Sequence, residues 1–211
     1  MTTPLQEGTV NPEDFSAERD HLTVERSASG LVLVTLDYPD RRNAMSGEMM
    51  SAWGRLAAAI KMDPTVRAVV VTGAGTAFTS GGDTGWIGGD PDATVDELRT
   101  KMMAFYRTWL SMRDVPVPVL AALNGAAVGG GACIALAADI RIASENAKFT
   151  VPFLKLGIHP GMATTYLLPE VVGVAAARDL LLTGRVIGAQ RMLELGLVSE
   201  VLPADGFVDA A

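Results

Sequence analysis

Cysteine is almost absent from this chain, whose 211 residues include only Cys133. No disulfide can therefore form within the chain, and a lone thiol is typical of a reducing compartment, so we expect a cytoplasmic protein. Long apolar runs are absent too, because none reaches the roughly 18 residues that a membrane-spanning helix requires. Residues 1–20 are polar and lack the apolar centre of a signal peptide, and we expect them to form a flexible lead.

Two nucleotide-binding motifs are also missing. The chain has neither the G-x-G-x-x-G of dinucleotide-binding folds nor a phosphate loop ending in Gly-Lys-Ser/Thr, which argues against nicotinamide and nucleotide-triphosphate chemistry. Positive charge is scarce as well, and the net charge of −7 argues against a nucleic-acid partner. The hydrophobic content of 49% is typical of a globular protein, and we expect one domain over residues 21–211.

Two glycine-rich turns are the most informative features present. The apolar run 68–72 leads to Phe78-Thr79-Ser80-Gly81-Gly82-Asp83, and the apolar run 119–123 leads to Asn124-Gly125 and the glycines 129–131. Backbone N–H groups at the start of a helix carry partial positive charge and bind anionic oxygen. Two such turns can aim one N–H each at a single carbonyl oxygen, which forms an oxyanion hole. The alternative is that these glycines only allow close packing of strand and helix.

Apolar periodicity predicts an α/β fold with alternating strands and helices. Residues 21–26 and 31–36 are expected to form a hairpin, and Ser46 to cap a helix that stops at Asp63-Pro64. The further elements expected are a strand at 67–72, a helix at 95–112, a strand at 119–123, a helix through residue 137, strands at 139–143 and 148–151, three short helical segments broken at Gly173 and at 184–188, and a last strand at 197–202.

From about His21 to its end, the chain resembles the crotonase (enoyl-CoA hydratase/isomerase) superfamily. The resemblance rests on Arg42-Asn43-Ala44-Met45, on both glycine turns, on Asp139-Ile140-Arg141-Ile142-Ala143 and on Leu156-Gly157-Ile158-His159-Pro160-Gly161. It is locally closest to the branch that contains ring-epoxide isomerases and aroyl-CoA dehalogenases. The resemblance implies a crotonase-like spiral of ββα repeats, an acyl-CoA thioester ligand and a homotrimer or hexamer, with a C-terminal helical part that is short or absent here.

The resemblance also implies a set of site residues. The two N–H groups that hold the thioester oxygen fall on Gly82 and Gly130. The residues expected along the coenzyme A moiety are Arg42, Ala44, Gly81, Gly82 and Asp83, where Asp83 has the alternative of a purely structural role. No metal is expected, and no cofactor other than the coenzyme A that belongs to the substrate.

This sequence departs from the family at three positions that carry acids in its members. The two glutamates of hydratases fall on Cys133 and Phe153, and the aspartate of the isomerase and dehalogenase branch falls on Gly161. His159 is therefore the first candidate for the acid/base group, because its pKa suits proton transfer near neutral pH. It has the alternative of a packed or merely exposed side chain. Cys133 is either a nucleophile or, as we favour, a small core residue.

Other side chains have one functional and one structural interpretation each. The acids Asp90, Asp92, Asp96 and Glu97 could close over the acyl group or form a solvated loop and helix start. The aromatic residues Trp86, Phe105, Tyr106 and Trp109 could line an acyl pocket or belong to the core, and Asp139 is expected to pair locally.

Two hypotheses for function follow from these residues. The first is an acyl-CoA enzyme that stabilises a thioester enolate, with isomerisation favoured over hydration because one base suffices for it. The alternative is a non-catalytic protein that binds acyl-CoA.

Overall fold

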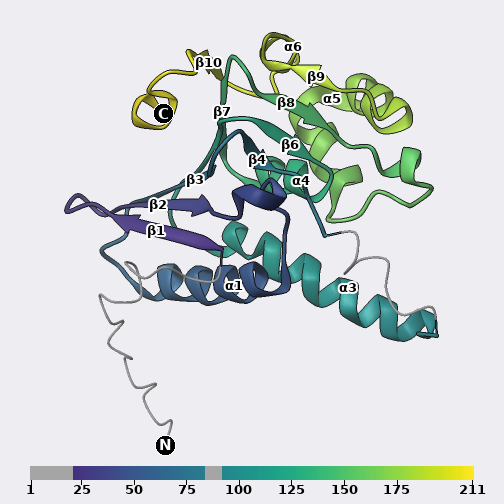
Figure 1. Cartoon of the computed structure of the whole chain (residues 1–211), viewed down its shortest axis with the longest axis horizontal. Coiled ribbons are helices and arrows are strands. Elements are labelled where there is room, and N and C mark those ends of the chain that lie inside the picture. Colours follow the sequence, from purple (N-terminus) through teal and green to yellow (C-terminus); the bar gives the residue numbers. More distant parts are fainter. Residues whose placement is uncertain (1–20, 84–91) are drawn as a thin grey trace, which may run out of the picture.

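The computed structural model describes residues 21–83 and 92–211. In these residues ten strands form two sheets (Figure 1). The six-stranded sheet has the order β1-β2-β3-β5-β7-β10, with bounds Leu22–Arg26, Leu31–Leu36, Ala68–Gly73, Val119–Leu123, Ile140–Ser144 and Glu200–Leu202. The four-stranded sheet has the order β4-β6-β8-β9, with bounds Ala77–Thr79, Ala126–Val128, Lys148–Thr150 and Ile187–Gly188.

A repeated unit of two strands and a helix builds both sheets. The strand pairs β3–β4, β5–β6 and β7–β8 each begin in the larger sheet and turn into the smaller one. Because β3, β5 and β7 are parallel neighbours, as are β4, β6 and β8, each repeat advances by one strand in both sheets. The expected spiral of ββα repeats is therefore confirmed.

Helices follow the strand pairs and cover the sheets. Their bounds are α1 Gly47–Met62, α3 Val95–Trp109, α4 Gly130–Ala137, α5 Thr164–Thr183, α6 Ala189–Glu194 and α7 Phe207–Ala210, with 3-10 helices η2 Pro39–Arg41, η3 Leu110–Asp114 and η4 Phe153–Leu156. Helices α1 and α3 pack against each other, and in Figure 1 α1 lies below β1 and β2 while α3 extends to the lower right. Between them the buried rings of Trp53 and Trp109 have centroids 5.3 Å apart.

The expected elements are largely confirmed. The hairpin β1–β2 is antiparallel, and the Ser46 hydroxyl accepts a hydrogen bond from the Met49 N–H at the start of α1. The strand β3 is buried along most of its length, as a continuous apolar run in a parallel sheet requires. Among the described residues, no helix combines the length and the apolar character needed to cross a membrane.

Three expectations need correction. Strands β4 and β6 lie within segments interpreted as turns, because three-residue strands are too short to show a periodicity. The helix expected over 95–112 ends at Trp109 and continues as the 3-10 helix η3. The last strand begins at Glu200 rather than at residue 197, because Leu197 and Val198 pack into the core as the chain leaves α6.

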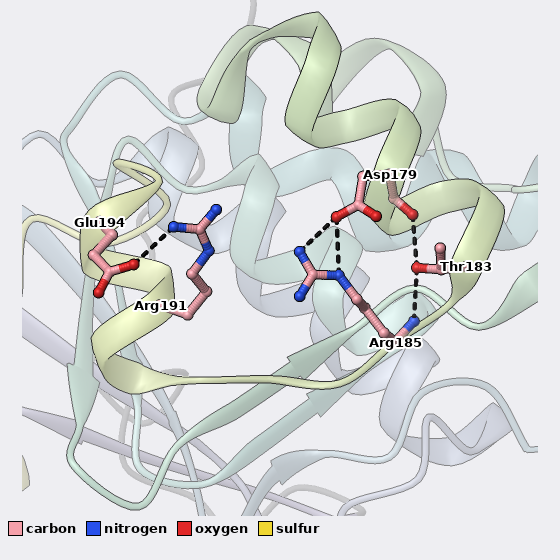
Figure 2. Close-up of polar contacts among 5 residues, drawn as sticks. All are labelled: Asp179, Thr183, Arg185, Arg191 and Glu194. Carbon is pink, nitrogen blue, oxygen red and sulfur yellow. Dashed lines mark hydrogen bonds and ion pairs between the residues drawn. The ribbon is translucent and has the colours of Figure 1, made fainter.

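Ion pairs hold the segment between α5 and α6 (Figure 2). The Arg185 guanidinium pairs with the Asp179 carboxylate, and the Thr183 hydroxyl donates to the Asp179 carbonyl at 2.7 Å. Arg191 pairs with Glu194 at 2.7 Å within α6. All four charged side chains are about half exposed, so each pair contributes little, about 0–1 kcal/mol. The Arg185–Asp179 pair mainly fixes how the chain leaves α5.

Candidate active site

The two glycine turns lie side by side because the strands before them pair. Strands β4 and β6 are parallel neighbours, so the loops that follow them leave the same edge of the smaller sheet. The loops are in close contact at Gly81, whose φ is +89°. A Cβ atom at Gly81 would overlap the Val128 carbonyl oxygen and lie 3.2 Å from the Gly130 nitrogen. Glycine is therefore required at position 81 by both the backbone conformation and the contact.

The amides of Gly82 and Gly130 converge in this arrangement. A Cβ atom on Gly130 would lie 3.5 Å from the Gly82 nitrogen, so the two residues share one small space. Gly130 is the first residue of α4, and Gly129 before it provides no side-chain cap. Within residues 21–83 and 92–211, neither of these two N–H groups donates a hydrogen bond to the protein. Together they can offer two donors and the positive end of a helix dipole to one oxygen.

Two methionine thioethers surround the converging amides. The position of a Gly130 Cβ lies 3.0 Å from the Met45 sulfur and 3.3 Å from the Met162 sulfur, and both methionines are buried. A negative charge at this place would have apolar thioether groups on two sides. Hydrogen bonds from the two amides would therefore be stronger than in water.

Asn43 holds the loop before α1 against the first glycine turn. It is fully buried, and its side-chain nitrogen donates to the carbonyls of Ala77 at 2.8 Å and Ala74 at 2.9 Å, with a longer bond to Phe78 at 3.2 Å. Its own carbonyl accepts from the Thr79 hydroxyl at 2.6 Å, and that hydroxyl accepts from the Gly81 N–H at 3.1 Å.

The sequence analysis quoted Asn43 within a motif but gave it no role. The sequence does contain a signal for this role, because Asn43 stands next to the apolar residues Ala44 and Met45. An amide that is buried among apolar residues needs several hydrogen-bond partners.

Asn124 plays the same part at the second glycine turn. Its side-chain oxygen accepts from the Gly73 N–H at 3.1 Å, and its nitrogen donates to the carbonyls of Gly75 and Ala77. Asn43 and Asn124 thus both donate to the Ala77 carbonyl, which joins the corners of two neighbouring repeats. The two asparagine side chains thereby fix the strands that lead to Gly82 and Gly130.

The residues expected along coenzyme A form one continuous edge beside the amides. The Met45 N–H donates to the Gly81 carbonyl at 2.9 Å, and the Ser80 N–H donates to the Arg42 carbonyl at 2.9 Å. The Arg42 side chain is exposed on a left-handed backbone, and Ala44 is buried. Asp83 forms an ion pair with Arg41 at 3.4 Å, which fits the structural alternative given for this carboxylate.

His159 lies in the loop after η4 with an exposed side chain. It forms no hydrogen bond with any residue in the part of the chain that the structure describes. Its role as acid/base group stays a prediction.

Cys133 is fully buried, and its sulfur lies 2.9 Å from the Thr164 hydroxyl and 3.2 Å from the Gly129 carbonyl oxygen. Burial raises the pKa of the Cys133 thiol to about 12, so the group is a neutral thiol at physiological pH. The favoured interpretation as a core cysteine agrees with this environment.

The acids before and within α3 have structural partners. Thr94 and Glu97 form a capping box, and hydrogen bonds from Thr94 lower the pKa of the Glu97 carboxyl. Asp96 pairs with Arg99, and Asp92 is exposed. Trp86 and Asp90 lie outside the described residues.

Of the remaining aromatic candidates, Phe105 and Trp109 belong to the core, whereas Tyr106 is half-buried. The Asp139 carboxylate accepts from the Val119 N–H at 2.8 Å, which is the local role expected of it.

Comparison with known proteins gives a consistent picture. The family model for enoyl-CoA hydratase/isomerase matches residues 26–211. The chain belongs to the enoyl-CoA hydratase/isomerase family. A Mycobacterium tuberculosis protein named probable enoyl-CoA hydratase EchA14 is 42% identical over 187 residues, which cover 86% of this chain and 69% of that protein. The 1,2-epoxyphenylacetyl-CoA isomerase of Escherichia coli is 35% identical, covering 86% and 70%.

Solved structures agree with the fold. An enoyl-CoA hydratase from Bacillus anthracis superposes with a TM-score of 0.84 at 32% identity, covering 90% of this chain and 73% of that one. The crotonase fold expected from the sequence is confirmed, and the relatives are enzymes of the hydratase/isomerase type. The chain has Cys133, Phe153 and Gly161 at the positions where the resemblance implies acids.

Proposed function

We propose that this family member acts on an acyl-CoA thioester through an enolate. The observation that carries the proposal is the convergence of the Gly82 and Gly130 amides, which have no protein acceptor among the described residues. When a proton leaves the carbon next to the thioester, negative charge moves to the carbonyl oxygen. Two fixed donors stabilise this oxygen more strongly in the enolate than in the ground state, which is the condition for catalysis.

Coenzyme A in this proposal lies along the edge formed by Arg42, Ala44 and residues 81–83, and residues 21–211 form one acyl-CoA-binding unit. Coenzyme A is part of the substrate, and no other cofactor is required. The exposed Arg42 guanidinium suits a phosphate of the coenzyme. We further propose a cytoplasmic protein that assembles as a homotrimer or hexamer, as the family resemblance implies.

Within the family's chemistry, isomerisation is favoured over hydration. Hydration requires groups that position and activate a water molecule, and no carboxylate stands at Cys133, Phe153 or Gly161. Moving a proton between two carbons requires one acid/base group. The lack of an acid at these three positions also favours the second candidate, a protein that binds acyl-CoA without converting it.

Incubation with saturated, 2-enoyl and 3-enoyl CoA thioesters in D2O separates the two candidates. Mass spectrometry would follow deuterium at Cα and Cγ, hydration and free coenzyme A, and calorimetry would follow binding. The enzyme proposal expects deuterium uptake and double-bond migration, which Gly130→Ala reduces. Tight binding without exchange in the whole panel would refute it in favour of the binding protein. Loss of exchange in His159→Ala would assign the proton transfer to that imidazole.

A further inference from the structure

The hydroxyl of Tyr106 packs against Gly161, in the loop that leads to Met162 and the two amides. Tyr106 lies in the last turn of α3, and its side chain reaches the loop before α5. A Cβ atom at Gly161 would overlap the Tyr106 hydroxyl oxygen and lie 2.8 Å from the ring carbon that bears it. A side chain at position 161 would therefore have to displace the Tyr106 ring.

Tyr106 also lies near Cys133. The Cys133 sulfur lies 3.9 Å from the carbonyl oxygen of Gly161, the residue that the Tyr106 hydroxyl contacts. Cys133 and Gly161 are two of the three positions where this chain lacks an expected acid, and both carry small residues. One tyrosine hydroxyl thus packs against the first of these acid-free positions, Gly161, and lies near the second, Cys133.

Met162 links this hydroxyl to the oxyanion donors. It directly follows Gly161, and its sulfur lies 3.3 Å from the Cβ position of Gly130. Cys133, on the other side, is in the first turn of α4, three residues after Gly130. Gly161, which the Tyr106 hydroxyl contacts, is thus followed directly by a residue whose thioether packs beside the Gly82–Gly130 amide pair.

The hydroxyl is chemically available in this place. In the part of the chain that the structure describes, Tyr106 forms no hydrogen bond through its side chain, whereas the neighbouring Thr164 hydroxyl contacts both Cys133 and the Gly161 carbonyl. Tyr106 is half-buried, which leaves part of the side chain accessible to a ligand. A phenol can donate a proton and, as phenolate, accept one.

We propose that Tyr106 is the catalytic acid/base group of this enzyme, an inference that rests on the proposed acyl-CoA function. The Tyr106 phenolate takes a proton from Cα of a 3-enoyl thioester. The electron pair of that C–H bond forms the Cα–C(O) double bond, and the thioester oxygen becomes an oxyanion held by Gly82 and Gly130. The phenol then returns its proton to Cγ, the double bond moves to Cα–Cβ, and the phenolate is regenerated. No further reactant is consumed.

The environment of Tyr106 gives this step a characteristic pH dependence. Burial, and then the nearby Cys133, raise the pKa of the Tyr106 phenol above its ordinary value of 10.0. Only a small fraction of the enzyme carries the phenolate at neutral pH. The rate should therefore rise about tenfold per pH unit through the alkaline range, until the pKa is approached.

The test compares Tyr106→Phe, which keeps the ring and removes the hydroxyl, with Tyr166→Phe. Tyr166 is exposed in the first turn of α5, so its substitution removes a hydroxyl that lies at the surface. With a 3-enoyl-CoA in D2O, we expect at least about 100-fold slower exchange in Tyr106→Phe and less than about twofold change in Tyr166→Phe. Calorimetry should show that both variants bind the thioester within about threefold of the wild type.

Two further measurements keep the proposal testable if Tyr106→Phe folds poorly. Replacing the three tyrosines by fluorotyrosine lowers the phenol pKa, and the rising limb of the pH profile should move to lower pH. The double variant Tyr106→Ala/Gly161→Asp places a carboxylate in the vacated space. We expect it to regain at least about tenfold over Tyr106→Ala, with a pH profile that rises in the acidic range.

Exchange in Tyr106→Phe within threefold of the wild type would overturn the proposal, and so would a pH profile that fluorotyrosine does not move. Loss of exchange in His159→Ala while Tyr106→Phe stays active would assign the step to the imidazole instead. A further outcome is that the wild-type protein binds the thioesters but exchanges no proton at any pH. It refutes the proposed function itself, and the role of Tyr106 with it.

Discussion

Replacing Gly130 by alanine should separate catalysis from stability. The new methyl group would lie 3.5 Å from the Gly82 nitrogen, 3.0 Å from the Met45 sulfur and 3.3 Å from the Met162 sulfur. The sulfur atoms are the flexible parts of their side chains and can shift by a few tenths of an ångström. The methyl group then remains in the space that the thioester oxygen needs.

The two expected effects differ in size. Alanine stabilises a helix by about 1 kcal/mol relative to glycine. Gly130 is the first residue of α4, and its φ is not positive, so alanine can adopt the same backbone conformation. This gain offsets the tighter contacts, so the free energy of unfolding should stay within about 1 kcal/mol of the wild type. Blocking one oxyanion donor costs about 10²- to 10³-fold in rate. We expect proton exchange to fall by at least about 100-fold.

Gly47→Ala is the matched control. Gly47 is also the first residue of a helix, α1, and no atom lies within 4 Å of its Cβ position. Thermal unfolding and the D2O exchange assay would be run on both variants. Exchange in Gly130→Ala within threefold of that in Gly47→Ala would refute the assignment of this space to the thioester oxygen. Equal loss in both would trace the effect to the helix start rather than to the amide pair.

Three further predictions concern Asn43, Cys133 and Asp63. Asn43→Ala should lower the free energy of unfolding by about 3 kcal/mol in denaturant titrations, because buried carbonyls lose their donor; an unchanged midpoint would contradict this. Cys133 should resist iodoacetamide in the native protein and react after denaturation, since burial raises its pKa to about 12; rapid native labelling, seen by mass spectrometry, would contradict it.

The third of these predictions is a pH effect on stability. Asp63 ends α1, and bonds from Thr65, together with the ion pair to Arg26, lower the pKa of its carboxyl below 3.8. Because the folded-state pKa is lowered, this stabilisation is complete above the ordinary pKa of 3.8 and is lost as the pH falls from there through the folded-state pKa. Asp63→Asn should thus melt a few degrees lower at neutral pH and lose this difference in acid. An equal difference at both pH values would contradict the charge as its cause.

The sequence predicted those features that depend on near neighbours along the chain. The cap at Ser46, the end of α1 at Asp63-Pro64 and the strand Val119–Leu123 follow from local hydrogen bonding and from apolar periodicity. The glycine turns were also visible, because positive φ and close approach restrict position 81 to glycine. The family resemblance then joined these local signals into one fold.

Strand pairing across distant parts of the chain decided the rest. The short strands β4 and β6 bring Gly82 next to Gly130 although 47 intervening residues separate them in the sequence. Asn43 and Asn124 meet at one carbonyl for the same reason, and no local pattern reveals a shared acceptor.

The positions of the acid/base candidates show this division most clearly. Sequence reasoning found that Cys133, Phe153 and Gly161 carry no acid and proposed His159 from its place in the loop. The tertiary structure leaves His159 exposed and packs the Tyr106 hydroxyl against Gly161, some 55 residues away in the chain. Residue types and turn chemistry are local and can be read in order. Which hydroxyl fills the space left by a glycine depends on how α3 packs, and this only the folded chain determines.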